Sequence, residues 1–190
     1  MTGALVLPGL YNSGADHWQS RWEAGDSTLL RVVQDDWHAP RCSDWLRTLE
    51  QAVELAGEST VLVAHSLSCA LVAHWAAADS RRRVRGALLV APADAEASGF
   101  PRGPTGFAPM PIQPLRFRSV VVASINDPYV TLERARAFAN AWGSAFVNIG
   151  QKGHINSVSG LGEWREGLAL LRDLQLSQGW DARSGPVERK

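Results

Sequence analysis

Six short apolar segments recur along the chain, and none of them alternates apolar with polar residues. A strand exposed to water on one face alternates in this way, whereas a strand covered on both faces is apolar throughout. The pattern therefore predicts a mostly parallel sheet of about six buried strands, at residues 4–7, 29–33, 60–64, 86–91, 119–124 and 145–149.

Segments with helical periodicity lie between these strands, at residues 16–24, 42–55, 67–78, 131–142 and 162–174. We expect Ser43 to cap the second helix and Thr131 the fourth, which ends before Gly143. Strands that alternate with helices are typical of a doubly wound, three-layer α/β/α fold. A chain of 190 residues suits one such domain, predicted here at residues 1–178. The polar, Gly- and Pro-containing residues 179–190 are predicted to form a loose tail.

The net charge of the chain is zero. No general field therefore attracts nucleic acid or an anionic membrane. The basic run formed by Arg81, Arg82, Arg83 and Arg85 lies between an apolar helix and an apolar strand, which favours a solvated loop. No signal-peptide pattern and no membrane-length apolar run is present, so we expect a cytoplasmic protein.

The two cysteines, Cys42 and Cys69, form no CxxC pair, which argues against a zinc or dithiol site. Cys69 falls in a helical pattern and is predicted to be a small core residue. The segment with Asp35, Asp36 and His38 brings potential metal ligands together. Acidic residues after a strand more often form turns, so we predict no metal site.

Ser66 directly follows the third apolar segment and precedes a helix, within the sequence Ala64-His65-Ser66-Leu67-Ser68. A sharp strand-to-helix turn that carries a nucleophile requires small residues two positions before and after it. Ala64 and Ser68 meet this requirement in place of the usual glycines. The N–H of Leu67, at the helix N-terminus, is placed to stabilise an oxyanion. A serine that merely caps a buried helix is the alternative interpretation.

A nucleophilic serine needs a base, and in this fold the order along the chain is Ser, then an acid, then His. Asp127 follows the fifth predicted strand and His154 follows the sixth. Carboxyl ends of parallel strands meet at one edge of the sheet, so all three side chains are expected there. Taken alone, Asp127 before a proline is also a common turn residue.

The turn after the first strand is expected to supply a second oxyanion donor, the N–H of Leu10 or, as a weaker candidate, that of Tyr11. We predict that substrate contacts Tyr11, His17, Trp18 and Phe107. Trp18 and Trp22 have a second interpretation as core residues. Phe107 belongs to a loop at residues 93–115 with five prolines, and it, Phe100 and Met110 either line the mouth of a pocket or pin the loop to the surface. His65 is expected to pack beside its strand, and His74 to be a hydrogen-bonded core residue.

The sequence resembles the small α/β-hydrolases of the serine hydrolase family that includes bacterial YdeN-like proteins and the retinoblastoma-binding protein nine hydrolase. The matching segments span roughly residues 4 to 174: LPGL, DHWQSRWE, DWHAP, LVAHSLSCALVAHWA, VAPAD, SVVVASINDPYVTLERARAFANAWGS and GHINSVSGLGEWREGL. The resemblance implies a compact hydrolase without a large cap domain, with Ser66 as nucleophile, Asp127 as orienting residue and His154 as base. Many relatives have Gly where this chain has Ser68; a hydroxymethyl group takes more room in the turn, but we expect it to be tolerated because serine is small.

These observations predict a serine hydrolase that cleaves small-molecule carboxylic esters through an acyl-enzyme, with no metal or organic cofactor. A thioesterase or amidase would use the same three residues. A protein that retains the fold only as an interaction module is the other alternative, although such a module has no need of all three groups. No protein partner is indicated by the sequence.

Overall fold

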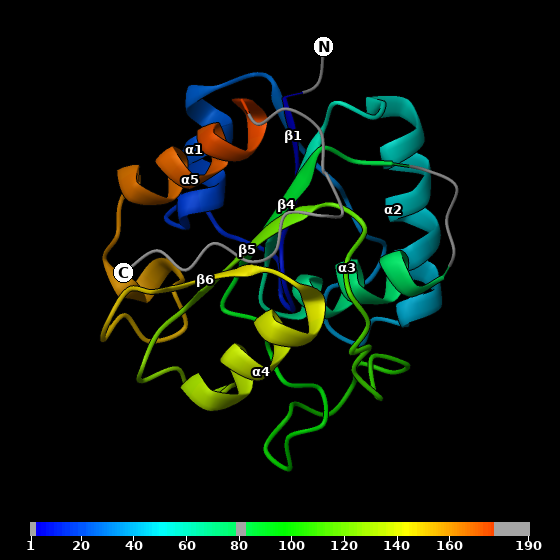
Figure 1. The fold of residues 1–190 in the computed structure, drawn as a ribbon, viewed down its shortest axis with the longest axis vertical. Helices are drawn as coiled ribbons and strands as arrows, with labels where there is room; N and C mark the ends of the chain where they lie inside the picture. The colour runs from blue at the N-terminus through cyan, green and yellow to red at the C-terminus, as the bar shows by residue number, and fades with distance from the viewer. Residues whose placement is uncertain (1–2, 79–82, 177–190) are drawn as a thin grey trace.

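The computed structural model describes residues 3–78 and 83–176 and contains one sheet of six parallel strands (Figure 1). Its order is β2-β1-β3-β4-β5-β6, so the direction of winding reverses between β1 and β3. The predicted sheet is confirmed: β1 (Ala4–Leu7), β2 (Leu29–Arg31), β3 (Val61–His65), β4 (Gly86–Val90), β5 (Arg118–Ala123) and β6 (Ala145–Asn148). The predicted tail at 179–190 and the residues Arg81 and Arg82 of the basic run lie outside the described residues.

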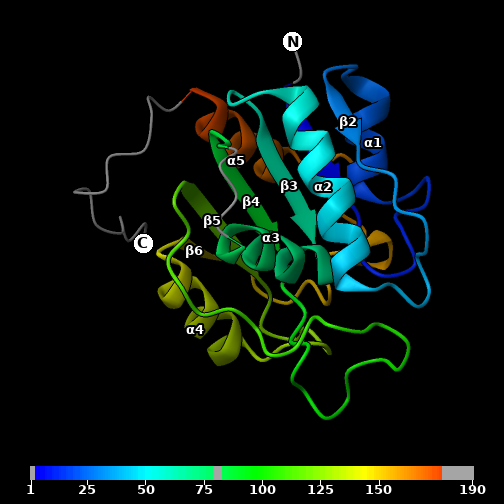
Figure 2. The ribbon, with the colours of Figure 1, turned by 90° about the vertical axis from the view of Figure 1, so that its right-hand side faces the viewer.

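Helices cover both faces of the sheet and complete the predicted three layers (Figures 1 and 2). On one face lie α1 (Trp18–Gly25) and α5 (Arg165–Leu176). The other face carries α2 (Cys42–Ala56), α3 (Leu67–Ala77) and α4 (Leu132–Trp142). Each layer of helices encloses its own apolar cluster against the sheet. The α/β/α fold class predicted from the sequence is therefore confirmed.

The caps of α4 are as predicted, whereas the cap of α2 is not. The Thr131 hydroxyl accepts the N–H of Arg134 at 3.1 Å, and Gly143 ends α4 in the left-handed conformation. Ser43 lies inside α2, which begins one residue earlier, so its prediction as N-cap was wrong. The carbonyl of Thr105 accepts the N–H of Cys42 at 2.9 Å, and this contact with a distant loop substitutes for a side-chain cap.

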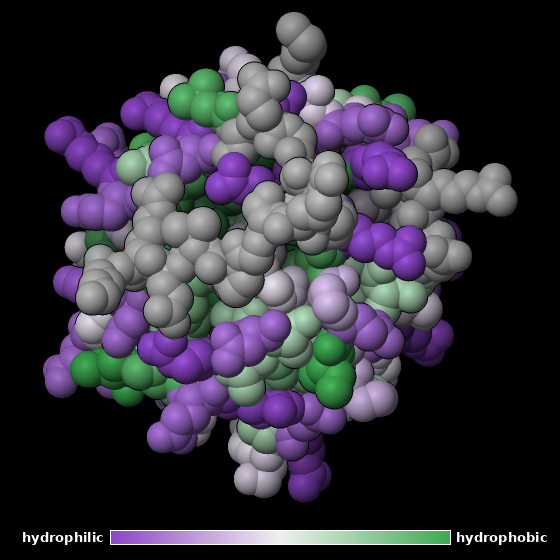
Figure 3. All heavy atoms as spheres, viewed as in Figure 1, coloured by the Kyte–Doolittle hydropathy of each residue, from purple (hydrophilic) through white to green (hydrophobic). Residues whose placement is uncertain are grey.

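The centre of the sheet is fully buried, and both cysteines lie in the core. Every residue of β3 and β4 is buried, and Leu62 of β3 is 0% exposed. Cys69 packs in the core as predicted, and burial raises the pKa of its thiol. Burial raises the pKa of the Cys42 thiol to about 11. Outside the grey residues of Figure 3, hydrophilic side chains predominate and apolar ones form separate patches. Among residues 3–78 and 83–176, no helix is long and apolar enough to span a membrane.

The long connection between β4 and β5 is pinned to the body of the protein by buried side chains and hydrogen bonds. Phe107 and Met110 are buried in the core below it. His74 of α3 bonds the carbonyl of Phe107 at 2.9 Å, and the indole N–H of Trp142 donates to the carbonyl of Pro111 at 2.8 Å. His74 is thus a hydrogen-bonded residue at the edge of the core, as predicted. Of the two interpretations of this loop, Phe107 and Met110 support the pinned one.

Candidate active site

Ser66 lies at a strained turn between β3 and α3. Its φ of 57° and ψ of −121° are rare for a residue with a side chain. Neighbouring groups pack closely on the turn: a Cβ built on Gly9 would lie 2.7 Å from the Cβ of Ser66. Ser68 does not crowd the turn, because its hydroxyl donates a 2.6 Å hydrogen bond to the carbonyl of Pro8. The surroundings of Ser66 are therefore closely packed.

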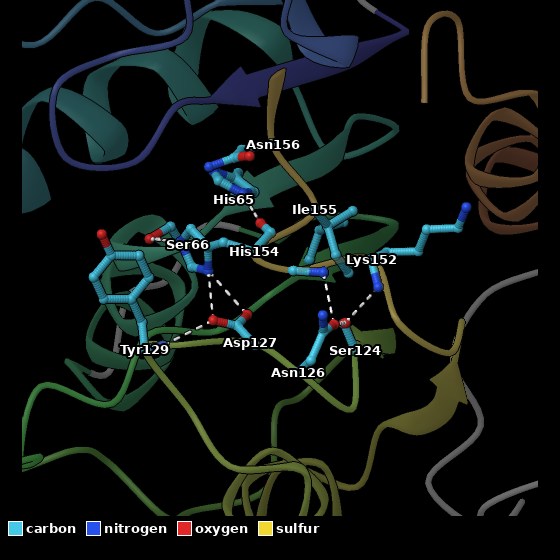
Figure 4. A network of polar contacts seen from close by, with 12 residues as sticks. His65, Ser66, Ser124, Asn126, Asp127, Tyr129, Lys152, His154, Ile155 and Asn156 are labelled. Carbon is cyan, nitrogen blue, oxygen red and sulfur yellow. Dashed lines mark hydrogen bonds and ion pairs between the residues drawn. The ribbon is translucent and has the colours of Figure 1, made fainter. Parts of the chain in front are cut away.

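The structure brings the three predicted side chains together (Figure 4). Nε2 of His154 lies 2.8 Å from the Ser66 hydroxyl oxygen, and Nδ1 lies 2.9 Å from both carboxylate oxygens of Asp127. The Asp127 side chain is 0% exposed and also accepts the N–H of Tyr129 at 2.9 Å. An unbroken hydrogen-bonded chain thus runs from a buried carboxylate through an imidazole to the serine hydroxyl.

Two polar residues missed by the sequence analysis join the loops that carry Asp127 and His154 (Figure 4). The side-chain oxygen of Asn126 accepts the N–H of Gly153 at 2.8 Å, and the Ser124 hydroxyl accepts the N–H of Lys152 at 2.9 Å. These bonds set the spacing between the end of β5 and the loop after β6. The signal available in the sequence was a pair of polar residues just before Asp127.

His65, inside the turn, supports the main chain of His154. Its Nε2 donates to the His154 carbonyl at 2.9 Å, and the centroids of the two rings lie 4.9 Å apart. Burial lowers the pKa of His65 well below its ordinary value, and the nearby His154 and His17 rings lower it further. His65 is therefore a neutral donor beneath the site. The sequence indicated only that His65 packs beside its strand, and its bond to the His154 carbonyl was not predicted.

His17 precedes α1 and lies beside His65, with ring centroids 4.7 Å apart. Its Nδ1 accepts the N–H of Gln19 at 3.2 Å, and its buried Nε2 has no partner among the residues described. Burial, followed by Arg31 and His154, lowers the pKa of His17 to about 4. His17 is accordingly uncharged at neutral pH and carries its proton on Nε2.

The two residues predicted to supply oxyanion donors, Leu10 and Leu67, line a common cavity. The N–H of Tyr11, the alternative donor, is already bonded elsewhere. The N–H of Tyr11 donates to the carbonyl of Trp37 at 2.8 Å, which excludes this weaker candidate. Within the described ranges, no acceptor takes up the N–H of Leu10 or of Leu67. Leu10 and Leu67 both line the cavity beside Ser66. Their role toward an oxyanion stays a prediction.

The cavity above Ser66 has a volume of about 230 Å³, and its wall includes two of the four residues predicted to contact substrate. Tyr11 and His17 line it. Trp18 and Phe107 do not. Trp18 is buried under the loop after β6, where its indole N–H donates to the carbonyl of Ile155 at 2.7 Å. Phe107 packs against Trp45 in the core, with ring centroids 5.7 Å apart. Phe100 lies in the wall, which agrees with its interpretation as a residue at the mouth of a pocket. Six further wall residues were not predicted: Asn12, Ala93, Pro101, Tyr129, Asn156 and Ser157.

The possible metal site of the sequence analysis is a turn. The Asp36 carboxylate accepts the N–H of His38 at 2.7 Å and the N–H of Ala39 at 3.0 Å. These bonds are those of an Asx turn, the role predicted for an acid after a strand. In the part of the chain that the structure describes, no group of three metal-ligating side chains comes together.

The fold, with a serine at a strained turn after β3 and its partners at the same edge of the sheet, defines an α/β-hydrolase. The model of the family described as "Serine hydrolase" matches residues 4–173, and the chain belongs to this family. The predicted likeness to YdeN-like hydrolases is confirmed by solved structures. No curated protein sequence matches the chain.

Three solved structures illustrate the likeness. A putative YdeN-like hydrolase from Pectobacterium atrosepticum is 28% identical, with a TM-score of 0.80 over 91% of this chain and 90% of that one. The ydeN gene product of B. subtilis is 19% identical, with a TM-score of 0.70 over 92% and 98% of the two chains. The fold extends to a monoacylglycerol lipase from Paleococcus ferrophilus, at 11% identity, a TM-score of 0.66, and coverage of 90% and 93%.

Proposed function

We propose that this serine hydrolase cleaves small, uncharged carboxylic esters through an acyl-enzyme formed on Ser66. The observation that carries the proposal is the chain of hydrogen bonds from Asp127 through His154 to Ser66, at 2.9 and 2.8 Å. This chain ends at Ser66, which lies on a strained turn and lines the cavity. Membership of the serine hydrolase family supports the hydrolytic chemistry.

The proposed reaction is acyl transfer to water in two steps. Ser66 attacks the ester carbonyl while Nε2 of His154 takes its proton, and His154 then gives that proton to the leaving alcohol. Asp127 accepts the Nδ1–H of His154 and so keeps Nε2 free to act as the base. In the second step, water gives its proton to His154 and attacks the acyl carbon, which releases the acid and restores Ser66.

The developing oxyanion is stabilised by two backbone donors in this proposal. The N–H of Leu67 points from the start of α3, where the helix dipole adds partial positive charge. The N–H of Leu10 comes from the loop after β1, whose Gly9 packs closely against Ser66. Both groups belong to the main chain, so the hole is formed before substrate arrives and needs no side chain to move.

The cavity supports a small, neutral substrate. Its volume of about 230 Å³ lies below the usual range of drug-sized sites. In the described part of the chain, its wall contains no Lys, Arg, Asp or Glu, and its polar groups are hydroxyls, amides and imidazoles. A charged acyl group would lose its hydration there without gaining an ion pair. We therefore expect neutral acyl groups to be preferred.

The proposal is tested by labelling with a fluorophosphonate probe and by hydrolysis of p-nitrophenyl acetate and butyrate. The native protein is compared with Ser66→Ala and His154→Ala, and with Ser43→Ala on the exposed side of α2 as a matched control. We expect labelling and hydrolysis in the native and control proteins. Both variants at the site should lose the label and at least about 1,000-fold in kcat.

The outcome also separates the alternative functions. Hydrolysis that persists in Ser66→Ala would contradict a serine nucleophile. A native protein that is folded but neither labelled nor active would support a non-catalytic interaction module. Panels of matched esters, thioesters and amides then rank the three substrate classes, since the same residues serve all of them.

A further inference from the structure

In the described ranges, the main chain of residues 8–12, which we call the oxyanion loop, takes part in three hydrogen bonds. The carbonyl of Pro8 accepts from the Ser68 hydroxyl at 2.6 Å, and the N–H of Tyr11 donates to Trp37 at 2.8 Å. The N–H of Asn12 donates to the carbonyl of Gly9 at 3.1 Å. Only the first of these bonds connects the loop with the element that carries Ser66.

These bonds determine where the N–H of Leu10 points. In a trans peptide, the C=O of one residue and the N–H of the next point in opposite directions. The peptide between Gly9 and Leu10 is trans, and its carbonyl is directed toward Asn12. The N–H of Leu10 is therefore directed to the opposite side. Close packing of Gly9 on Ser66 keeps this peptide beside the nucleophile, since even a Cβ at Gly9 would not fit.

Ser68 connects the two elements that carry the proposed oxyanion donors. It lies in the first turn of α3, one residue after Leu67, and is 1% exposed. Its hydroxyl reaches across to the first residue of the oxyanion loop, two residues before Leu10. In the described ranges, it is the one donor found on the Pro8 carbonyl. A glycine at position 68 would satisfy the steric need of the turn but would leave this contact unmade.

We propose that Ser68 is a positioning residue of the oxyanion hole, which sets the separation between the N–H groups of Leu10 and Leu67 through its bond to Pro8. The inference rests on the proposed function of the same site. Preorganised donors stabilise the charge of the transition state more than the neutral carbonyl of the bound ester. Loss of the Ser68 hydroxyl therefore lowers kcat and leaves KM nearly unchanged.

The test compares Ser68→Ala and Ser68→Gly with the native protein, using p-nitrophenyl butyrate as substrate. Ser144→Ala is the matched control, because it also removes a buried serine hydroxyl. Ser144 directly precedes β6, and its hydroxyl lies 2.6 Å from that of Ser119 in β5. We expect kcat to fall by about 10-fold in both Ser68 variants and KM to stay within about twofold of native. This loss of kcat is smaller than the loss of about 100-fold or more that follows when an oxyanion donor is removed entirely. Ser144→Ala should keep the native kcat.

A second measurement separates positioning from a merely structural role. A trifluoromethyl ketone forms a tetrahedral adduct with the serine, and the oxyanion of this adduct occupies the hole. Its inhibition constant should rise in the Ser68 variants by the same factor by which kcat/KM falls. If the hydroxyl only stabilised the fold, the melting temperature would fall in the Ser68 and Ser144 variants alike. The inhibition constant and kcat/KM would then not change by the same factor.

Three results would overturn the assignment. The first is a native kcat in both Ser68 variants, and the second is an increase in KM alone. The third is an equal loss of kcat in Ser144→Ala. If the native protein itself hydrolyses no ester and binds no ketone, the proposed function fails and this assignment fails with it. Activity in the native protein but none of the expected changes at Ser68 refutes the positioning role only.

Discussion

The body of the sheet and its carboxyl edge are built on different principles. In the body, the residues of β3 and β4 are buried in extended conformation, and apolar contacts account for their packing. At the edge, five residues other than glycine have a positive φ: Tyr11, Asn12, Ser66, Ala91 and Ile155. Such conformations cost of order 1–3 kcal/mol each and persist only where the surroundings enforce them. The body therefore supplies the stability that holds the strained edge in place.

Hydrogen bonds at the edge connect loops that are distant in the sequence. Asn126 holds Gly153, His65 holds the main chain of His154, and Ser68 holds Pro8. The donors and acceptors of these pairs come from the start of α3 and from the ends of β1, β3, β5 and β6. Changes at the edge should therefore affect the chemistry, and changes in the body the free energy of unfolding.

The largest expected effect is at the edge. Asp127→Asn is nearly isosteric, but an amide that presents its NH₂ group to His154 favours the wrong tautomer of the imidazole. We expect kcat for p-nitrophenyl butyrate to fall by about 10⁴-fold, with little change in the melting temperature. Asp16→Asn, at an exposed carboxylate, is the control and should keep native activity. A variant that unfolds at a much lower temperature would show that edge and body are not separable at this residue.

The converse change lies in the body. Leu62→Ala removes most of a fully buried side chain from the middle of β3 and should lower the free energy of unfolding by about 3 to 4 kcal/mol. The kcat per serine titrated with the fluorophosphonate should stay within about twofold of native. Urea unfolding provides the first measurement, and Leu55→Ala, which is 88% exposed, provides the control. A large loss of kcat per titrated serine would contradict the expectation that changes in the body of the sheet affect stability and not the chemistry.

His17 sharpens the comparison, because a titratable group of the edge is buried in its neutral form. Its pKa is lowered from 6.5 to about 4, so between these values the unfolded chain binds a proton that the folded chain does not. Stability is therefore complete above pH 6.5 and falls as the pH drops toward 4, by at most about 3 kcal/mol from this residue.

The measurement is urea unfolding at several pH values between 8 and 4. His17→Asn retains an acceptor for the N–H of Gln19 but does not titrate, so its stability should decline less steeply with acid than that of the native protein. His65 contributes in the same direction and should leave a residual slope. The exposed His38→Asn variant should follow the native curve. Parallel curves for native protein and His17→Asn would refute the linkage.

The sequence was sufficient for the features that follow from burial. Continuous apolar runs located all six strands. Because the carboxyl ends of parallel strands lie at one edge of the sheet, the sequence also predicted that Ser66, Asp127 and His154 lie close together. Phe107 and Trp18 were assigned to the cavity because large apolar side chains suit a pocket wall and a core equally well. Their positions depend on Trp45 and on the carbonyl of Ile155, which are distant in the sequence.

Contacts between loops could not be predicted from the sequence either, because their partners are also distant along the chain. Whether the N–H of Tyr11 or of Leu10 remains available depends on where the Trp37 carbonyl lies. The cap of α2 is likewise supplied by Thr105, more than 60 residues away, so no local pattern marks it. Small residues around Ser66 were predictable from sterics, but the bond from Ser68 to Pro8 required the two elements to be placed first.

The burial of both thiols lowers the reactivity of the cysteines toward electrophiles and oxidants. The thiolate is the reactive form of cysteine, and a pKa of about 11 leaves Cys42 with roughly one thiolate in 10⁴ molecules at pH 7. Cys69, three residues after Ser66, is more deeply buried and less acidic still. In the described ranges the cavity wall contains no cysteine, so we expect a covalent inhibitor that enters it to react at the proposed nucleophile, the Ser66 oxygen, and not at a thiol.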